Sequence, residues 1–229
     1  MPLSGLNSFK FIAKDLLIDN NSSINTDIMN FLSIDCSTET GSLFVKAKNK
    51  TFSKVLQSDK LINDLLVKRI LDFFEENDIN FGDLNEIFVN QGPGNFSSLR
   101  SSLAIAKGIS LSKNIKLCGY NTFTWSCTKF FNKKDFIYSL IKFRKKYFIK
   151  KYDKKLKGIS KAEEVTEKEI LGKYNSKFIV IPKNISKYFS EKILKLSNVN
   201  IVDLNHNELE FLHLKGLLNE DLIKPLYLS

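Results

Sequence analysis

The chain has few of the residues from which metal and nucleophilic centres are built. It contains two histidines, His206 and His213, and three cysteines in 229 residues. Two turns of helix would place the histidines about 10 Å apart, too far for both to bind one metal ion. We therefore expect both histidines on the surface, no metal site, and no Ser–His–Asp or Cys–His catalytic arrangement.

The cysteines Cys36, Cys118 and Cys127 are odd in number and lack metal-ligand spacing. This pattern predicts reduced, mostly buried thiols in a cytoplasmic protein. No run approaches the roughly 18 to 20 apolar residues of a membrane span, so no membrane association is expected. The length suits one compact unit or two small lobes, and 43% hydrophobic residues are enough for a core.

The positive charge of the chain is concentrated in one segment. Residues 129–157 contain twelve Lys or Arg and two acidic residues, a surplus equal to the whole net charge of +10. Aromatic and aliphatic residues interleave with them and indicate two strands with a turn near Arg144. Such a hairpin can contact nucleic-acid phosphates, or it can be a solvated, lysine-rich sheet edge.

Residues 86–108 form the most informative segment. A short apolar strand, 86–90, leads into a tight turn with Gly92 and Gly94 on either side of a proline. A helix then begins near Asn95 or Ser97, either of which can cap it. A glycine turn before a helix N-terminus can receive an anion, although an ordinary strand-to-helix turn has the same pattern.

The helix after this turn has small residues spaced by four, at Ser98, Ser102 and Ala106. They share one face, flanked by Leu99 and Leu103, and such a face allows another helix to approach closely. The partner helix lies either in this chain or in another one.

The remaining pattern predicts an α/β fold in two parts. The first part has strands 31–35, 42–47 and 51–55, helix 58–77, strand 86–90, helix 97–113 and strand 115–119. The second has a hairpin at 136–152, strand 177–181, helix 185–196, strand 199–203 and helix 206–218.

Four segments together resemble the TsaB (YeaZ) family, which takes part in making N6-threonylcarbamoyladenosine (t6A) in tRNA. Residues 92–108, GPGNFSSLRSSLAIAKG, are similar to the family's GPGSFTGLR-x-G-x-x-x-A-x-G signature. Residues 31–39, 118–123 and 225–228 resemble its opening LAIDTST-E strand, its GVSSL-type segment and its P-x-Y-L tail. Asn95, Ser98 and Ser102 replace smaller family residues, and Lys142-Phe143-Arg144 lacks the acidic residue of the family's DAR-type segment.

The resemblance implies the two-lobed actin-like, sugar-kinase-like ATPase superfold. Its N-terminal lobe would comprise residues 29–126 and its C-terminal lobe residues 127–229. Residues 1–28 precede the first family-like strand, so either Met29 is the true start or they are a loosely attached appendage.

The resemblance also implies a non-catalytic subunit that pairs with and activates the catalytic TsaD-type paralogue of the t6A complex. Helix 58–77 lacks the pair of histidines that TsaD uses for its metal, which agrees with a chain that is not catalytic by itself. A TsaE-type ATPase and tRNA would be the further partners. The alternatives are a stand-alone ATPase or phosphotransferase of the same superfold, and a homodimeric interaction protein.

No cofactor is expected for the chain alone, whereas ATP or ADP with Mg²⁺ are candidate ligands at the interface of the complex. The candidate site residues fall into three groups. For nucleotide or anion binding they are Asp35, Ser37, Thr38, Gly92 and Gly94. For the partner interface they are Ser98, Leu99, Arg100, Ser102, Leu103, Ala106, Leu65 and Leu66. For tRNA they are Arg144, Lys145, Lys146, Lys150 and Lys151.

Overall fold

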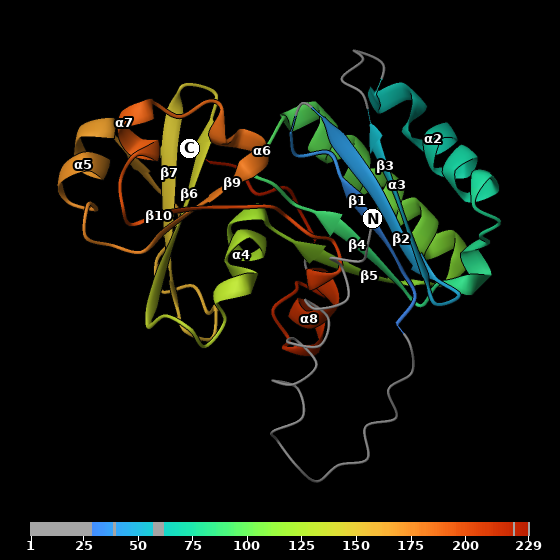
Figure 1. The fold of residues 1–229 in the computed structure, drawn as a ribbon. Helices are drawn as coiled ribbons and strands as arrows, with labels where there is room; N and C mark the ends of the chain where they lie inside the picture. Colours follow the sequence, from blue (N-terminus) through green and yellow to red (C-terminus); the bar gives the residue numbers. More distant parts are fainter. Residues whose placement is uncertain (1–28, 39, 57–61, 222, 229) are drawn as a thin grey trace, which may run out of the picture.

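The two lobes are stacked as alternating layers of helix and sheet (Figure 1). The computed structural model describes residues 29–38, 40–56, 62–221 and 223–228, so the predicted extension 1–28 lies outside the described residues. Each lobe is built on a five-stranded mixed sheet, as the predicted α/β class requires. No helix in the described ranges is both long and apolar enough to cross a membrane.

The first sheet has the strand order β3-β2-β1-β4-β5. Its strands are β1 (Phe31–Asp35), β2 (Gly41–Ala47), β3 (Lys50–Leu56), β4 (Glu86–Asn90) and β5 (Lys116–Tyr120). The first three strands pair antiparallel, whereas β4 joins β1 and β5 in parallel. The carboxyl ends of β1 and β4 therefore lie side by side, which brings together the two loops that the sequence singles out.

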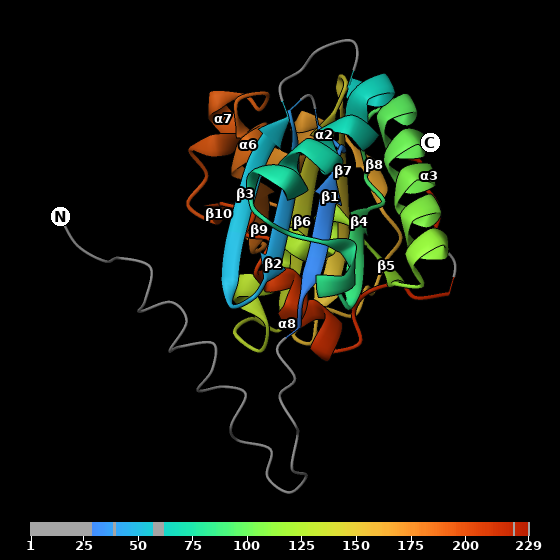
Figure 2. The same ribbon diagram turned by 90° about the vertical axis from the view of Figure 1, so that its right-hand side faces the viewer.

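Two helices cover the outer face of this sheet (Figure 2): α2 (Ile62–Glu76) and α3 (Phe96–Lys113). Successive side chains of a strand point to opposite faces of the sheet, so each strand contributes to the packing on both sides. In β1, Leu32 and Ile34 point outward and pack against these helices, while Phe31 belongs to the core on the inner face. All five residues of β1 are buried, because the sheet is covered on both sides.

The second sheet has the order β10-β9-β6-β7-β8. Its strands are β6 (Phe136–Phe143), β7 (Lys146–Asp153), β8 (Glu163–Val165), β9 (Ile179–Pro182) and β10 (Val199–Val202). The predicted hairpin is β6 and β7, and Arg144 occupies its turn with a φ of 57°. Short helices complete this lobe: α5 (Glu167–Gly172), α6 (Lys183–Ser186) and α7 (Glu191–Leu194).

The single helix predicted for residues 185–196 is wrong, since α6 and α7 are separate. Ser190 interrupts the run: its backbone is extended (φ −70°, ψ 150°) and its hydroxyl donates a hydrogen bond to Glu167. The sequence also missed β8, α5 and the short helix α4 (Thr122–Cys127). The helix predicted at 206–218 is the shorter α8 (Glu208–Leu214).

Helices α4 and α8 lie between the two sheets (Figure 1). After β10 the chain returns to the first sheet, where Asn219 and Gly119 form an isolated antiparallel bridge. Further along, Ile223 is buried in the core of the first lobe. Residues 206–221 and 223–228 are thus shared between the lobes, and the lobe boundary at 126/127 stays a prediction.

Candidate functional site

The loops that follow β1 and β4 meet around the side-chain amide of Asn90. Its nitrogen donates to Asp35 Oδ1 (3.1 Å), to Ser37 Oγ (3.2 Å) and to Thr122 Oγ1 (3.1 Å). Its oxygen accepts from the backbone N–H of Gly92 at 2.8 Å. Sequence reasoning missed Asn90, although a polar residue at the end of an otherwise apolar strand was a usable signal.

Asp35 is held inside the chain. Its carboxylate also accepts the backbone N–H of Ser37 at 2.8 Å, and only 5% of the residue is exposed. Burial raises its pKa, and the bonds from Ser37 and Asn90 oppose that rise. Of the other candidates for anion binding, Ser37, Gly92 and Gly94 lie beside it, while the hydroxyl of Thr38 turns away to the carbonyl of Thr40.

The two glycines permit the close approach of these loops. Gly92 has a φ of 105°, a conformation that L side chains rarely adopt. A Cβ at Gly94 would overlap the backbone of Ser37. The glycine turn therefore packs against the first loop of the same chain.

The N-terminus of α3 is capped as predicted. Asn95 is the cap, and its side chain accepts the backbone N–H groups of Ser97 (3.1 Å) and Ser98 (3.5 Å). Two donors that an anion would use are thus already satisfied inside the chain. The nucleotide site stays a proposal.

The predicted interface stripe on α3 needs correction. Leu99, Ser102, Leu103 and Ala106 are at most 4% exposed and pack inside this chain, and Leu66 of α2 is buried in the same lobe. Their side chains therefore cannot contact a partner in this conformation. For these residues the helix face packs inside this chain and not on a partner, since α3 lies on the sheet and on α2.

A different stripe of α3 faces solvent. It comprises Arg100, Ala104, Gly108 and Leu111, which is 84% exposed. A Cβ added at Gly108 would meet no atom within 4 Å. On α2, Leu65, Val67 and Leu71 are also exposed, at 38%, 48% and 50%.

An aromatic cluster continues this surface at the start of α3. The guanidinium carbon of Arg100 lies 3.9 Å from the ring centroid of Phe96, and its Nε donates to the Tyr227 hydroxyl at 3.0 Å. The rings of Phe96 and Tyr227 stack at 5.1 Å. The predicted P-x-Y-L tail thereby lies against the signature helix.

The five basic residues suggested for tRNA do not form one patch. Arg144, Lys145 and Lys146 are exposed at the hairpin turn, and Lys146 pairs with Glu164 at 2.6 Å. Lys150 and Lys151 are consecutive on β7 and so point to opposite faces of the sheet. Burial lowers the pKa of Lys150, whose ammonium lies 5.2 Å from the Tyr152 ring centroid.

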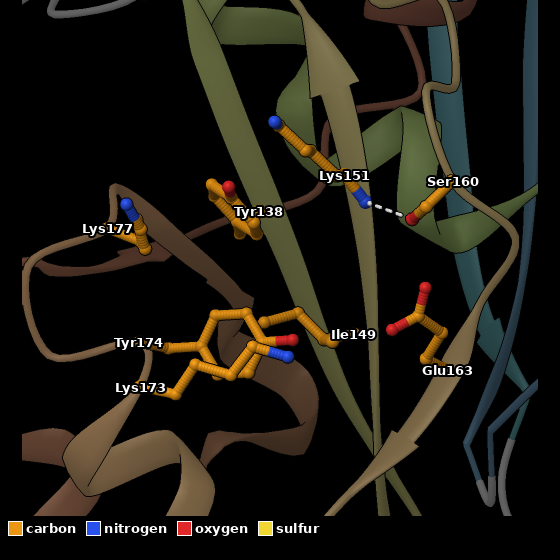
Figure 3. A pocket seen from close by; sticks show the side chains of 8 residues that line it. All are labelled: Tyr138, Ile149, Lys151, Ser160, Glu163, Lys173, Tyr174 and Lys177. Carbon is orange, nitrogen blue, oxygen red and sulfur yellow. Dashed lines mark hydrogen bonds between the residues drawn. The ribbon is translucent and has the colours of Figure 1, made fainter.

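Lys151 instead lines a pocket of about 190 Å³ on the outer face of the second sheet (Figure 3). Lys173 and Lys177 lie at the same pocket with Tyr138 and Tyr174, whose rings meet edge to face at 5.8 Å. Glu163 is the one acidic residue of the lining. The sequence did not indicate this grouping, because Lys173 and Lys177 are remote from the basic segment.

The expectation that both histidines lie on the surface is wrong. His206 is half-buried between the lobes, with Nδ1 2.9 Å from Ser33 Oγ and Nε2 3.0 Å from Ser42 Oγ. Its ring stacks on Phe44 at 5.3 Å. Burial lowers the pKa of His206 to about 3. The side chain of His213 is 15% exposed and lies near Cys118.

The three cysteines are buried and unpaired, as predicted. Burial raises the pKa of Cys36 to about 12, so this thiol is protonated at neutral pH. None of the three thiols is therefore placed as an exposed nucleophile.

The fold and its signature loop define a two-lobed, actin-like α/β protein. The structure of YeaZ from Pseudomonas aeruginosa has the same fold, with a TM-score of 0.65 over 88% of this chain and 100% of that one at 13% identity. The family model described as TsaD, tRNA N6-adenosine threonylcarbamoyltransferase, matches residues 60–137.

Two curated relatives, both called tRNA threonylcarbamoyladenosine biosynthesis protein TsaB, come from Buchnera aphidicola. The relative from strain Bp is 30% identical over 37% of this chain and 38% of its own length. The relative from subspecies Acyrthosiphon pisum is 26% identical over 61% of this chain and 66% of its own length. The matches thus span about two fifths and two thirds of these relatives. In sequence the chain is similar to these TsaB proteins, and in fold it is similar to YeaZ.

Proposed function

We propose that this chain acts in the biosynthesis of t6A in tRNA, as a subunit that pairs with and activates a TsaD-type catalytic paralogue. The observation that carries the proposal is the glycine turn and helix α3, whose sequence resembles the family signature except at Asn95, Ser98 and Ser102. Asp35 in the adjoining loop is buried and bonded to its own chain, which favours a supporting role over catalysis. Reduced, buried cysteines agree with a cytoplasmic location.

The proposed partner surface is the exposed stripe of α3 with the neighbouring exposed residues of α2. Ala104 and Gly108 lie four positions apart and carry little side chain, so a partner helix can approach the backbone of α3 closely. Leu111 and Val67 supply apolar area at its edges. The aromatic cluster around Arg100 extends the surface toward the signature loop.

The substitution Gly108→Leu tests this surface. It adds bulk where the chain itself has open space, and leucine has a higher helix propensity than glycine, so the isolated protein should melt no lower than the wild type. Complex formation with the TsaD-type subunit, measured by calorimetry, should weaken at least tenfold, and reconstituted t6A formation should fall with it. Gly172→Leu is the matched control, because Gly172 is also an exposed helical glycine with open space around it, in the other lobe.

Unchanged affinity of the Gly108→Leu variant would exclude this face as the contact. A homodimeric protein would instead show self-association of the wild type that Gly108→Leu abolishes. A stand-alone ATPase would show nucleotide turnover that depends on Asp35. In the proposed complex, ATP or ADP with Mg²⁺ would bind only when the partner is present, and tRNA and a TsaE-type ATPase would be the further components.

A further inference from the structure

Three potential metal ligands of different chemistry meet between the lobes, away from the signature loop. They are Glu86 at the start of β4, Cys118 in β5 and His213 in α8. Cys118 Sγ lies 3.4 Å from Glu86 Oε2 and 3.8 Å from His213 Nδ1, and His213 Nε2 lies 3.8 Å from Glu86 Oε1. One ligand atom from each residue can be chosen so that all lie within 4.8 Å of one another.

The fold explains why these residues converge. In the parallel pairing of β4 with β5, Cys118 aligns with Phe88, so Glu86 and Cys118 stand on the same inner face of the sheet. Helix α8 packs across this face, and the ring centroids of His213 and Phe88 are 5.7 Å apart. The segment after α8 adds Glu220, whose Oε1 lies 4.0 Å from His213 Nδ1.

We propose that Glu86, Cys118 and His213 bind one divalent ion of the Zn²⁺ type, with Glu220 as a fourth, carboxylate ligand. Tetrahedral zinc holds neighbouring ligand atoms about 3.3 to 3.6 Å apart, given Zn–S near 2.3 Å and Zn–N and Zn–O near 2.0 to 2.1 Å. The two 3.8 Å distances involve different ring nitrogens of His213, and only one nitrogen can bind the ion. A set with one atom from each residue lies within 4.8 Å, so side-chain rotation must shorten its longest separation by up to about 1.5 Å. A thiolate with an imidazole selects zinc-like ions over Mg²⁺.

The burial of the cluster suits a structural site. Cys118 is fully buried, and the side chains of Glu86 and His213 are 12% and 15% exposed. Glu220 is 46% exposed, which leaves an entry path, and it now pairs with Lys116 at 3.0 Å. On binding, the ion displaces the proton of the Cys118 thiol to solvent, and Glu220 exchanges Lys116 for the ion.

The ion would tie α8 and the segment beside it to β4 and β5. The ion would therefore stabilise the protein and fix the orientation of the lobes. This role is independent of the proposed role of the chain in t6A formation. No step of that role needs the ion.

Titration of the metal-free, full-length chain with Co²⁺ tests the site. Co²⁺ reports on its ligands, because a thiolate ligand gives a charge-transfer band in the near ultraviolet and tetrahedral geometry gives intense bands in the visible. We expect both bands to saturate at one equivalent and to be lost when Zn²⁺ is added. Zn²⁺ alone should raise the melting temperature, and a chelator should reverse the rise.

The cysteines of the chain allow a matched comparison. Cys118→Ser should abolish the charge-transfer band, whereas Cys127→Ser, at another buried cysteine, should leave it unchanged. Should Cys118→Ser fail to fold, Glu86→Gln and His213→Gln should each weaken Co²⁺ binding at least tenfold. Absence of a thiolate band in the wild type, or the same band in Cys118→Ser, would overturn the proposal.

Discussion

Two ionisable residues two positions apart, His206 and Glu208, should give opposite pH dependences of stability. His206 has its pKa lowered by burial to about 3, from 6.5 in an exposed histidine. Glu208 has its pKa raised by burial to about 7, from 4.5, although Lys129, 3.9 Å away, opposes the rise. Both side chains lie between the lobes, so protonation changes there act on the junction of the molecule.

The sign of each effect follows from which state binds more protons. Between pH 3 and 6.5 the unfolded chain protonates His206 and the folded chain does not, so stability falls as the pH falls. Between pH 4.5 and 7 the folded chain keeps Glu208 protonated and the unfolded chain does not, so stability rises as the pH falls. Each contributes about 1.4 kcal/mol per pH unit within its window.

From pH 7 to pH 5 the histidine should therefore remove about 2 kcal/mol of stability and the glutamate should add about as much. The two contributions nearly cancel in the wild type. Glu208→Gln leaves the histidine uncompensated, so this variant should lose about 2 kcal/mol over that range relative to the wild type. His206→Gln should show the reverse and gain stability toward pH 5.

Urea unfolding at constant ionic strength measures these differences. Trp125 is the only tryptophan of the chain and is 2% exposed, so its fluorescence reports unfolding of the junction, with circular dichroism as a second probe. Other titrating groups, Asp35 among them, are common to all variants and cancel in the comparison. Parallel pH profiles for the wild type and Glu208→Gln would refute the burial argument.

Two further predictions concern the candidate surfaces. Ser102→Leu should lower the free energy of unfolding by about 1 to 3 kcal/mol, because Ser102 is fully buried and the larger side chain must displace core atoms, while Ala104→Leu on the exposed side of the same helix should be neutral in chemical denaturation. Replacing the pocket lysines Lys151, Lys173 and Lys177 with Gln should weaken binding of tRNA and flatten its salt dependence in filter-binding assays. The same change at Lys187, Lys192 and Lys195 alters the net charge equally and serves as the control. If both triple variants lose the same affinity for tRNA, the pocket has no specific role in binding it.

Local sequence patterns were sufficient for the first lobe and the hairpin. The apolar run at β4, the glycine turn and an Asn cap predicted the strand, the turn and the start of α3, because each depends on neighbours within a few residues. The alternation of apolar and basic residues likewise located β6 and β7. The hydrogen bond from Ser190 to Glu167 joins residues 23 positions apart, at the break between α6 and α7. The local pattern does not contain this contact, and it predicted one continuous helix there.

The helix face shows why the partner surface could not be read from spacing alone. Two stripes of small residues run along α3, one through Ser102 and one through Gly108, and both recur every four residues. Leu99 and Leu103 flank the first stripe, and such apolar residues mark the side that faces the core. The sequence therefore contained the evidence that this face packs in the core, although its residues were predicted to contact a partner.

The histidines could not be placed from sequence because their neighbours are far away along the chain. The partners of His206 are Ser33 and Ser42, more than 160 residues earlier, and Cys118 lies 95 residues before His213. Spacing within one helix excluded a metal shared by the two histidines. It had no bearing on a site that takes one ligand from each of three elements.

These long-range contacts make the last part of the chain a connector between the lobes. His206 bonds to β1 and β2, Asn219 bridges to β5, and the backbone N–H of Leu226 donates to the carbonyl of Gln91 at 2.7 Å. The next residue, Tyr227, then reaches Arg100 on the proposed partner surface. These contacts attach the segment to the first lobe at successive points along its sheet. The aromatic cluster on α3 is therefore completed by a segment that the sequence alone assigns to the second lobe.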